Sequence, residues 1–369
     1  MVRYAARMAV ASLDIRRDLR FLGTVSRYLR LALVSFVCAG VSFAGCSRDS
    51  TIYFEESHWK VVKRLENTRV VFGSYSFSPD GNSLAAACLD GKIRLYATAT
   101  GDLLAEWESK HQRVSKATFS PGGTLLATVG TGPPVNVWNV EARTLVAAGD
   151  ELDGHIVSVS WSSDSTRMVA IDHASRFGEI IVLDALNLRK LAVLQGHTDM
   201  VQGVEFSPAG DIIASISYDE TVRIWDATTY AAVRTLHGHP DRILCMSFAP
   251  SGRFLVTSGL KGGLFEAGES LVVWDCTSWR PQHPLRNRYG TFGLLWSPDD
   301  SQLMTLDGYY VQWWDVTSGR LLGHRDRAAY PMDMALYSPD GRWAVNNETV
   351  RYVVTDTLVF WRYIPSKPR

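Results

Sequence analysis

Histidine, serine and aspartate occur together in one segment of the chain, and this combination can support nucleophilic catalysis. The segment contains His197, Ser215 and Ser217, Asp219 and Trp225. In a serine hydrolase, the hydroxyl attacks the substrate, the histidine takes its proton and the aspartate orients the imidazole ring. Such a triad must converge on one cleft, yet similar residues recur elsewhere in this chain. A catalytic role therefore has to be weighed against an internal repeat.

Other patterns with chemical meaning are missing from the sequence. The five cysteines include Cys88, Cys245 and Cys276, and none has the CxxC spacing or neighbouring histidine of a zinc site. No GxSxG, GxxxxGK or HExxH motif occurs. Basic and acidic residues balance at 38 each, which argues against a general nucleic-acid binder. The sequence therefore predicts no catalytic residue, no metal site, no cofactor and no nucleic-acid partner.

Short turn sequences recur along the chain at a spacing of about 43 residues. Each begins with SPDG or a variant and lies between two short apolar runs, which is typical of a β-hairpin. The second residues of these turns are at 79, 121, 163, 208, 250, 298 and 339. A large residue, often followed by aspartate, closes each copy: Tyr96, Trp138, Leu183, Trp225, Trp274, Trp314 and Trp361. Gly-His pairs that begin at 154, 196, 238 and 323 form a third landmark.

The three landmarks, in fixed order, resemble those of WD-repeat β-propellers, and the resemblance covers about residues 59–364. Residues 196–226, GHTDMVQGVEFSPAGDIIASISYDETVRIWD, are close to the consensus of that family. The resemblance implies an all-β fold of seven blades, each with four antiparallel strands. The seventh copy ends before its fourth strand, whereas residues 59–65 precede the first copy without inner strands of their own. We therefore expect this N-terminal segment to close the ring as the outer strand of the seventh blade.

The resemblance also implies a structural role for the histidine, serine and aspartate. In WD-repeat proteins a hydrogen-bonded network joins the loop before a blade to the third strand of that blade. A buried polar network of this kind stiffens the blade when every member is paired. The residues assigned to such networks are His197, Ser215, Asp219, Trp225, His239, Trp274 and Trp314.

Residues 1–45 have the composition of a secretory signal peptide. Seven arginines precede the uncharged run LALVSFVCAGVSFAG, which is too short for an ordinary transmembrane helix. The sequence FAGC at 43–46 resembles the lipobox of bacterial lipoproteins, which implies lipidation of Cys46 and a lipid anchor in the cell envelope. A short uncleaved anchor helix is the alternative. Residues 46–58 then form a polar tether and 365–369 a C-terminal tail.

The loops that depart most from the repeat are expected to carry the binding site. In four-stranded antiparallel blades, the second-to-third loops and the connections between blades share one face. That face gathers arginines and aromatic residues, which are enriched at binding hot spots. The residues predicted to contact a partner are Arg113, Arg176, Phe177, Arg242, Phe265, Arg288, Tyr289, Arg327, Tyr330, Arg351 and Tyr352.

The sequence therefore predicts a non-enzymatic scaffold in the cell envelope that binds a protein or peptide partner. Two other functions stay open. A hydrolase or lactonase would need Asp, Glu, His or Asn side chains from several blades around a metal at the central opening. A sensor of a small ligand or glycan is the third class.

Overall fold

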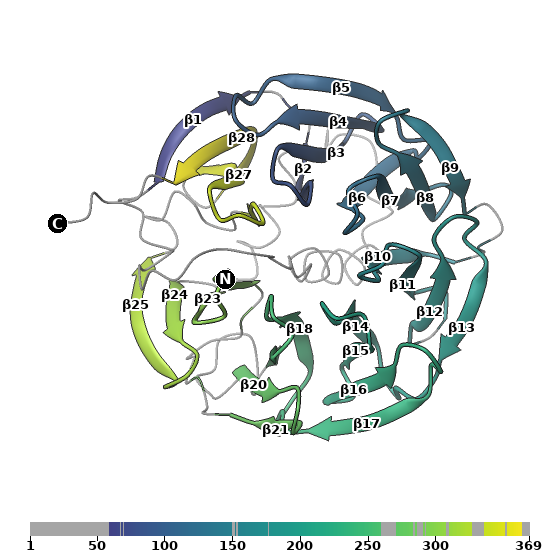
Figure 1. Cartoon of the computed structure of the whole chain (residues 1–369), viewed down its shortest axis with the longest axis vertical. Coiled ribbons are helices and arrows are strands. Elements are labelled where there is room, and N and C mark those ends of the chain that lie inside the picture. The colour runs from purple at the N-terminus through teal and green to yellow at the C-terminus, as the bar shows by residue number, and fades with distance from the viewer. Residues whose placement is uncertain are drawn as a thin grey trace, which may run out of the picture.

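The computed structural model describes residues 59–363 apart from 67, 69, 150, 151, 153, 176, 260–270, 283, 284, 286–290, 292, 308, 309, 327–335, 351 and 352. Within the described residues the chain forms 28 β-strands, arranged as seven four-stranded antiparallel sheets. Figure 1 shows these sheets as blades around a central axis. The prediction of an all-β, seven-bladed propeller is confirmed.

In each of the first six blades the chain runs outward, from an innermost strand beside the axis to an outermost strand at the rim (Figure 1). Blade 1 contains β2 (Val70–Phe77), β3 (Ser83–Cys88), β4 (Lys92–Ala97) and β5 (Leu103–Glu108). Blade 2 contains β6 (Arg113–Phe119), β7 (Leu125–Thr131), β8 (Val135–Asn139) and β9 (Thr144–Ala148). Blade 3 contains β10 (Ile156–Trp161), β11 (Arg167–Asp172), β12 (Glu179–Asp184) and β13 (Lys190–Leu194).

The next three blades repeat this order. Blade 4 contains β14 (Val201–Phe206), β15 (Ile212–Ser217), β16 (Thr221–Asp226) and β17 (Ala232–His237). Blade 5 contains β18 (Ile243–Phe248), β19 (Phe254–Gly259), β20 (Leu271–Asp275) and β21 (Arg280–Pro281). Blade 6 contains β22 (Gly293–Trp296), β23 (Gln302–Leu306), β24 (Tyr310–Asp315) and β25 (Arg320–Asp326).

Blade 7 takes its strands from both ends of the fold. It contains β26 (Leu336–Tyr337), β27 (Trp343–Val350), β28 (Val353–Tyr363) and β1 (Trp59–Leu65). β1 pairs antiparallel with β28, with Trp59 opposite Tyr363 and Leu65 opposite Leu358. The N-terminal strand therefore closes the ring as the outer strand of the seventh blade, as the sequence predicts.

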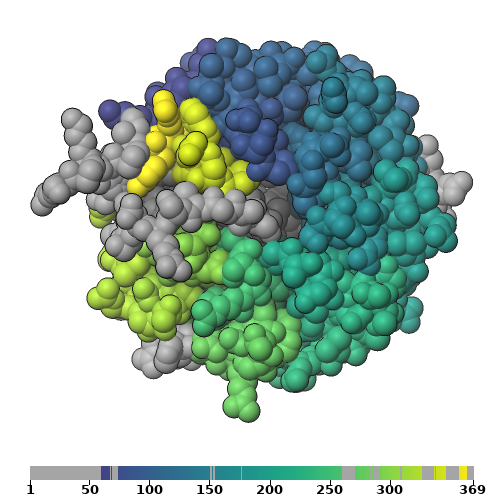
Figure 2. All heavy atoms as spheres, viewed as in Figure 1, coloured from purple at the N-terminus to yellow at the C-terminus, as the bar shows by residue number. Residues whose placement is uncertain are grey.

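The hydrophobic core lies between neighbouring blades, which pack side by side around the axis (Figure 2). In the described residues, seven clusters of buried side chains each combine two adjacent blades. Trp225 on β16, for example, packs with Ile171 of β11 in the preceding blade. Truncation of a buried tryptophan typically costs about 3–5 kcal/mol. The large residue that closes each repeat thus fastens its blade to the one before it.

The recurrent turns between first and second strands keep one backbone geometry. Ser78 Oγ donates to Asp80 Oδ1 at 2.5 Å, and Gly81 has the left-handed φ of 71°. Glycine suits this conformation because it has no Cβ. Ser165 and Asp300 occupy the same position in blades 3 and 6 with φ of 62° and 61°. The hairpin therefore forms even in the copies whose turn sequence departs from SPDG.

Candidate functional site on the loop face

The antiparallel order of the strands gives the ring two different faces. The turn face carries the first-to-second and third-to-fourth turns of each blade, such as 78–82 and 98–102. The loop face carries the second-to-third loops and the connections between blades, such as 89–91 and 109–112. Because the two faces are built from different connections, their side chains make different contacts.

On the turn face, each first-to-second turn contacts the next one around the ring, and together they form a collar of turns. Three of the contacts are hydrogen bonds between Gly122 N and Ser165 Oγ (2.9 Å), Ser163 Oγ and Ala209 O (3.3 Å), and Ser251 N and Asp300 Oδ1 (3.2 Å). At the other four contacts, a glycine of one turn packs against a residue of the neighbouring turn. A Cβ added to that glycine would lie 3.3–3.6 Å from the neighbouring residue: Gly123 on Pro79, Gly252 on Pro208, Gly341 on Pro298 and Gly81 on Asp340. The surfaces of these turns are thus used in contacts between neighbouring blades.

On the loop face, the most complete polar network lies in blade 4. His197, in the connection before β14, has Nδ1 2.9 Å from Asp219 Oδ2 and Nε2 2.8 Å from Ser215 Oγ. Trp225 Nε1 donates to the same Ser215 Oγ at 2.9 Å. The structure therefore brings together the four predicted residues, with Ser215 rather than Ser217 as the hydroxyl. Ser215 is fully buried, so its hydroxyl is out of reach of a substrate.

Asp219 is ionised within this network. Burial alone would raise the pKa of Asp219, but hydrogen bonds from His197, Thr221 and the Thr198 N–H outweigh it and hold the pKa well below its usual value. Thr221 Oγ1 lies 2.6 Å from Asp219 Oδ1, and the Thr198 nitrogen lies 2.9 Å from Oδ2. A carboxylate with this many donors holds a loop in place.

Blades 5 and 6 contain parts of the same network. In blade 5, His239 Nε2 lies 2.7 Å from Thr257 Oγ1, and Trp274 Nε1 donates to that hydroxyl at 2.8 Å. Burial lowers the pKa of His239 to about 4, so the ring is neutral near pH 7. In blade 6, Trp314 Nε1 donates to Thr305 Oγ1 at 3.0 Å. Threonine thus takes the place that Ser215 has in blade 4.

Blade 2 has a variant of this network, although none of its residues was assigned to a network from the sequence. His111 Nε2 lies 3.0 Å from Thr128 Oγ1, which also accepts a hydrogen bond from Trp138 Nε1 at 3.0 Å. Asn136 Nδ2 lies 3.3 Å from His111 Nε2 and donates to the Ser109 carbonyl at 3.0 Å. The Trp138 landmark could have indicated this network. Thr128, which accepts the indole hydrogen bond of Trp138, lies ten residues before it, just as Ser215 lies ten residues before Trp225.

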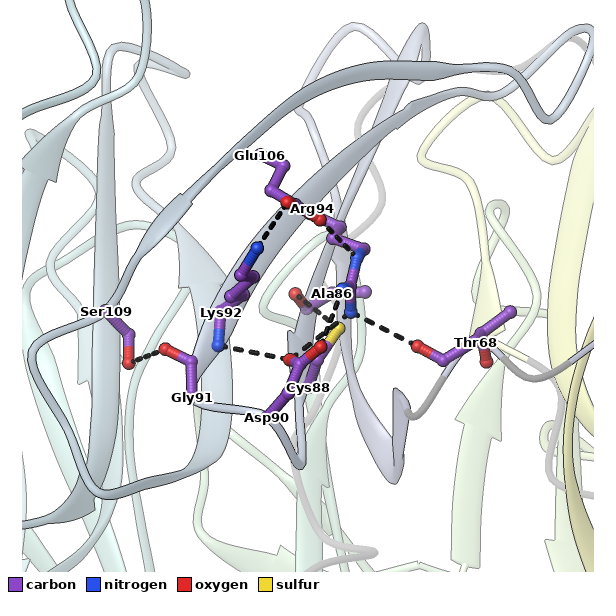
Figure 3. Close-up of polar contacts among 9 residues, drawn as sticks. All are labelled: Thr68, Ala86, Cys88, Asp90, Gly91, Lys92, Arg94, Glu106 and Ser109. Atoms are coloured by element: carbon purple, nitrogen blue, oxygen red, sulfur yellow. Dashed lines mark hydrogen bonds and ion pairs between the residues drawn. The ribbon is translucent and has the colours of Figure 1, made fainter.

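Blade 1 replaces the histidine network with ion pairs (Figure 3). Arg94 on β4 lies 2.6 Å from Asp90 and 2.8 Å from Glu106, and Lys92 lies 2.5 Å from Glu106. Arg94 Nη1 also donates to the Thr68 carbonyl at 3.3 Å, in the segment that joins β1 to β2. Arg94 therefore fastens the ring-closing segment to blade 1.

This ion-paired cluster was not predicted, although a signal was present in the sequence. Asp90 lies two residues after the end of β3, as Asp219 lies two residues after the end of β15.

Burial raises the pKa of the neighbouring Cys88 thiol to about 11, and Cys88 belongs to the core between blades 7 and 1. The thiol is therefore protonated and unreactive near pH 7.

In the described residues of blade 3 no histidine network is found, and the long β11–β12 loop contacts blade 4. His155 is exposed, and its backbone N–H donates to Asp172 Oδ1 at 2.9 Å. The carbonyl of Phe177 accepts the N–H of Val201 at 2.8 Å, and His173 Nε2 lies 3.1 Å from the Val201 carbonyl. The Gly-His landmark at 154 thus marks a blade connection without marking a network histidine.

Three of the predicted partner-binding residues lie within the described residues, and all three are on the loop face. Arg113 is the exposed first residue of β6, and Phe177 lies in the β11–β12 loop. Arg242 precedes β18, with its guanidinium carbon 5.0 Å from the centre of the Tyr218 ring. The other predicted residues lie outside the described residues: Arg176, Phe265, Arg288, Tyr289, Arg327, Tyr330, Arg351 and Tyr352.

Neither a cluster of metal ligands nor a membrane-spanning helix is found in the described residues. Across the part of the chain that the structure describes, no three His, Cys, Asp or Glu side chains are grouped as a metal site. The same part contains no helix long and apolar enough to cross a membrane.

Comparison with protein families identifies the repeats. The model for the WD domain, G-beta repeat, matches residues 188–226 and 231–275. The model for the anaphase-promoting complex subunit 4 WD40 domain matches residues 44–164. Together with the seven-bladed ring, these matches define the class: the chain is a WD-repeat β-propeller.

Curated relatives share part of this chain. Actin-interacting protein 1 of Drosophila melanogaster is 28% identical over 188 residues, which cover 49% of this chain and 30% of the relative. Protein hir1 of Schizosaccharomyces pombe is 27% identical over 195 residues, 44% of this chain and 21% of the relative. A subunit of chromatin assembly factor 1 from Gallus gallus is 28% identical over 176 residues, 40% of this chain and 31% of the relative. The matched region thus spans less than a third of each relative.

The predicted cell-envelope localisation is wrong by these comparisons. The relatives come from fly, fission yeast and chicken, and two of their names refer to actin and to chromatin assembly. The prediction depended on residues 1–46 alone, and a short apolar run after basic residues does not by itself define a compartment. Cys46 lies outside the described residues, so its lipidation is a prediction that the structure does not test.

Proposed function

We propose that the propeller, residues 59–364, is a protein-interaction scaffold that binds a protein partner on its loop face. The observation that carries the proposal is the contrast between the two faces. The turns of the turn face are short and uniform, and they contact one another around the ring. The loop face differs from blade to blade and presents exposed arginines, Arg113 and Arg242, on blades 2 and 5.

The chemistry of the loop face suits a protein partner. Arginine and aromatic side chains provide much of the binding energy at protein interfaces. The blade 4 network and the ion pairs of Arg94 hold the surrounding loops in fixed positions. A fixed surface loses less conformational freedom on binding, which favours affinity. The names of two relatives, an actin-interacting protein and a chromatin assembly factor subunit, also refer to interaction and assembly.

Site-specific photo-crosslinking of the full chain tests this proposal. A photoreactive residue is placed at Arg113 or Arg242 on the loop face, and at Arg320 or Arg342 on the turn face as matched controls. All four side chains are exposed arginines. We expect a partner protein to be crosslinked from the loop-face positions and not from the turn-face positions. Crosslinking from the turn face alone, or from none of the four positions, would contradict the proposal.

A further inference from the structure

We infer that the junction of blades 4 and 5 on the loop face binds a peptide segment in which one carboxylate is flanked by basic side chains. This inference rests on the proposed function and specifies the chemistry of the partner. It depends on five residues, here called the Tyr218 cluster: Asp199, Tyr218, Glu220, Asp241 and Arg242.

The centre of the cluster is an arginine that lies over a tyrosine. Arg242 of blade 5 has its guanidinium carbon 5.0 Å from the centre of the Tyr218 ring of blade 4, within the range of a cation–π interaction. The Tyr218 N–H donates to the Met200 carbonyl at 2.9 Å, which fixes the loop below the ring. The long arginine side chain is thereby restrained before any partner binds.

Among the residues that the structure describes, none accepts a hydrogen bond from the side-chain N–H groups of Arg242. Within the described residues its guanidinium makes no hydrogen bond and no ion pair, and the residue is exposed. The planar guanidinium presents paired N–H donors whose spacing matches the two oxygens of a carboxylate. A carboxylate of the partner is therefore the complementary group for this residue.

Two aspartates occupy equivalent positions in blades 4 and 5: Asp199 directly precedes Met200, and Asp241 directly precedes Arg242. Asp199 Oδ1 accepts the N–H of Met200 at 2.7 Å, and Asp241 Oδ1 accepts the N–H of Arg242 at 2.7 Å. Among the described residues, the second oxygen of each carboxylate has no hydrogen-bond donor. Each aspartate can therefore accept a hydrogen bond from a basic side chain while it still holds its own strand end.

Glu220 adds a third carboxylate at the tip of the β15–β16 loop. It is exposed and has the left-handed φ of 66°, whereas blade 1 has Gly91 with φ of 78° at the same position. Other turns of the ring also hold non-glycine residues in this conformation, such as Ser165 and Asp300. What distinguishes Glu220 is therefore the charge that it places at this loop tip, which glycine could not supply.

The charge pattern selects the ligand. The described part of the junction holds three carboxylates and one exposed cation: Asp241 adjoins Arg242, Glu220 lies two residues after Tyr218, and Asp199 adjoins Met200, whose carbonyl accepts the Tyr218 N–H. Asp219 is not counted with them, because Thr198 and Thr221 already donate to its two oxygens. A uniformly acidic peptide would be repelled by the three carboxylates, and a uniformly basic peptide would leave Arg242 without an acceptor. A segment with a central carboxylate and basic neighbours satisfies both conditions.

Fluorescence anisotropy with the full chain and synthetic peptides tests the inference. The probe is a labelled nonapeptide with a central Glu, two Lys residues on either side, and Ser and Gly elsewhere. One companion replaces Glu with Gln, and another replaces the four Lys residues with Ser. We expect each companion to bind about tenfold or more weakly than the probe, a loss typical of a broken charged pair.

Protein variants assign the effect to the cluster. Arg242→Ala should bind the Glu and Gln peptides equally weakly, because the carboxylate then has no partner. Arg234→Ala, an exposed arginine on β17 of blade 4, is the matched control and should keep the preference for Glu. The inference is overturned if the wild-type chain binds Glu and Gln peptides equally, if the probe does not bind, or if Arg234→Ala abolishes the preference as fully as Arg242→Ala does. If a partner is crosslinked from Arg113 and any of these results is also obtained, the proposed function stands and only the inferred peptide ligand is rejected.

Discussion

Ser215 shows at the scale of single residues how burial distinguishes a structural hydroxyl from a nucleophile. Its Oγ lies 2.8 Å from His197 and 2.9 Å from Trp225, and no part of the residue is exposed. A nucleophile must reach its substrate, whereas this hydroxyl has its hydrogen-bonding capacity used inside the protein. Removal of one partner would leave the others unsatisfied in a buried site.

We therefore expect His197→Ala to destabilise the fold by about 2–3 kcal/mol, because the buried polar groups of Asp219 and Ser215 would each lose a hydrogen-bond partner. Urea unfolding followed by tryptophan fluorescence measures the change. His155→Ala, at the exposed histidine of blade 3, is the matched control and should change the free energy of unfolding by less than about 0.5 kcal/mol. Equal stability of the two variants would contradict the structural role of His197.

His239 gives a prediction about pH. Burial lowers its pKa to about 4 in the folded state, whereas an unfolded histidine has a pKa of about 6.5. Between these values the unfolded chain binds a proton that the folded chain does not, so stability is full above pH 6.5 and falls as the pH decreases toward 4. We expect this one residue to account for a loss of about 3 kcal/mol across that window.

The measurement is the free energy of unfolding between pH 7 and pH 4 for the wild-type chain and for His239→Gln. Glutamine can keep a hydrogen bond to Thr257 but does not titrate. The pH dependence should therefore be shallower in the variant. Identical slopes would show that His239 is not a buried, neutral group.

At the scale of the strands and blades, the repeat predicted more than single motifs could. The landmarks at Trp225 and Trp274 placed two third strands, because each repeat must bury its large residue against the blade before it. The ring-closing role of residues 59–65 followed from one missing strand. The contact between Arg242 and Tyr218 could not be predicted, since it depends on how two blades meet and not on spacing within a repeat.

The same limit explains Arg94. Its partners Asp90 and Glu106 belong to its own blade, but Thr68 belongs to the segment that arrives from blade 7. The alternation of apolar residues predicted the strands of blade 1. It could not indicate a role for Arg94, a charged residue on the third strand. Ion pairs that replace a histidine network become visible only when the side chains are placed in space.

The closing strand β1 provides a prediction at the element scale. Val61 is opposite Trp361 and packs against the cluster between blades 6 and 7, whereas its neighbour Lys60 is exposed. We expect Val61→Asp to cost about 2 kcal/mol or more, because a charge would be placed against apolar side chains. Lys60→Asp should be nearly neutral. Thermal unfolding and limited proteolysis of β1 compare the two, and a similar loss in both variants would contradict the packing of Val61 against this cluster.

At the scale of the whole molecule, the ring is closed by non-covalent contacts between its two ends and not by a peptide bond. Trp59 and Tyr363 are opposite each other on β1 and β28, and β1 is held to the ring by strand pairing and packing. Nothing in this arrangement makes blade 7 the necessary site of closure. Any blade whose third-to-fourth turn is exposed could be closed in the same way.

A circular permutant tests this view of the ring. Residue 363 is joined to residue 59 by a short flexible linker, and the chain is opened between Thr229 and Tyr230 in the turn between β16 and β17. Thr229 is exposed there and the cut lies outside β16 and β17, so it leaves the strand pairing of blade 4 intact. We expect the permutant to fold with the same strand content and to lose only a few degrees in melting temperature, because β17 then closes blade 4 as β1 closes blade 7. A second permutant opened between Ala214 and Ser215, inside buried β15, should fail to fold, and circular dichroism with thermal unfolding measures both. If the two permutants behaved alike, closure by an interchangeable outer strand would be contradicted.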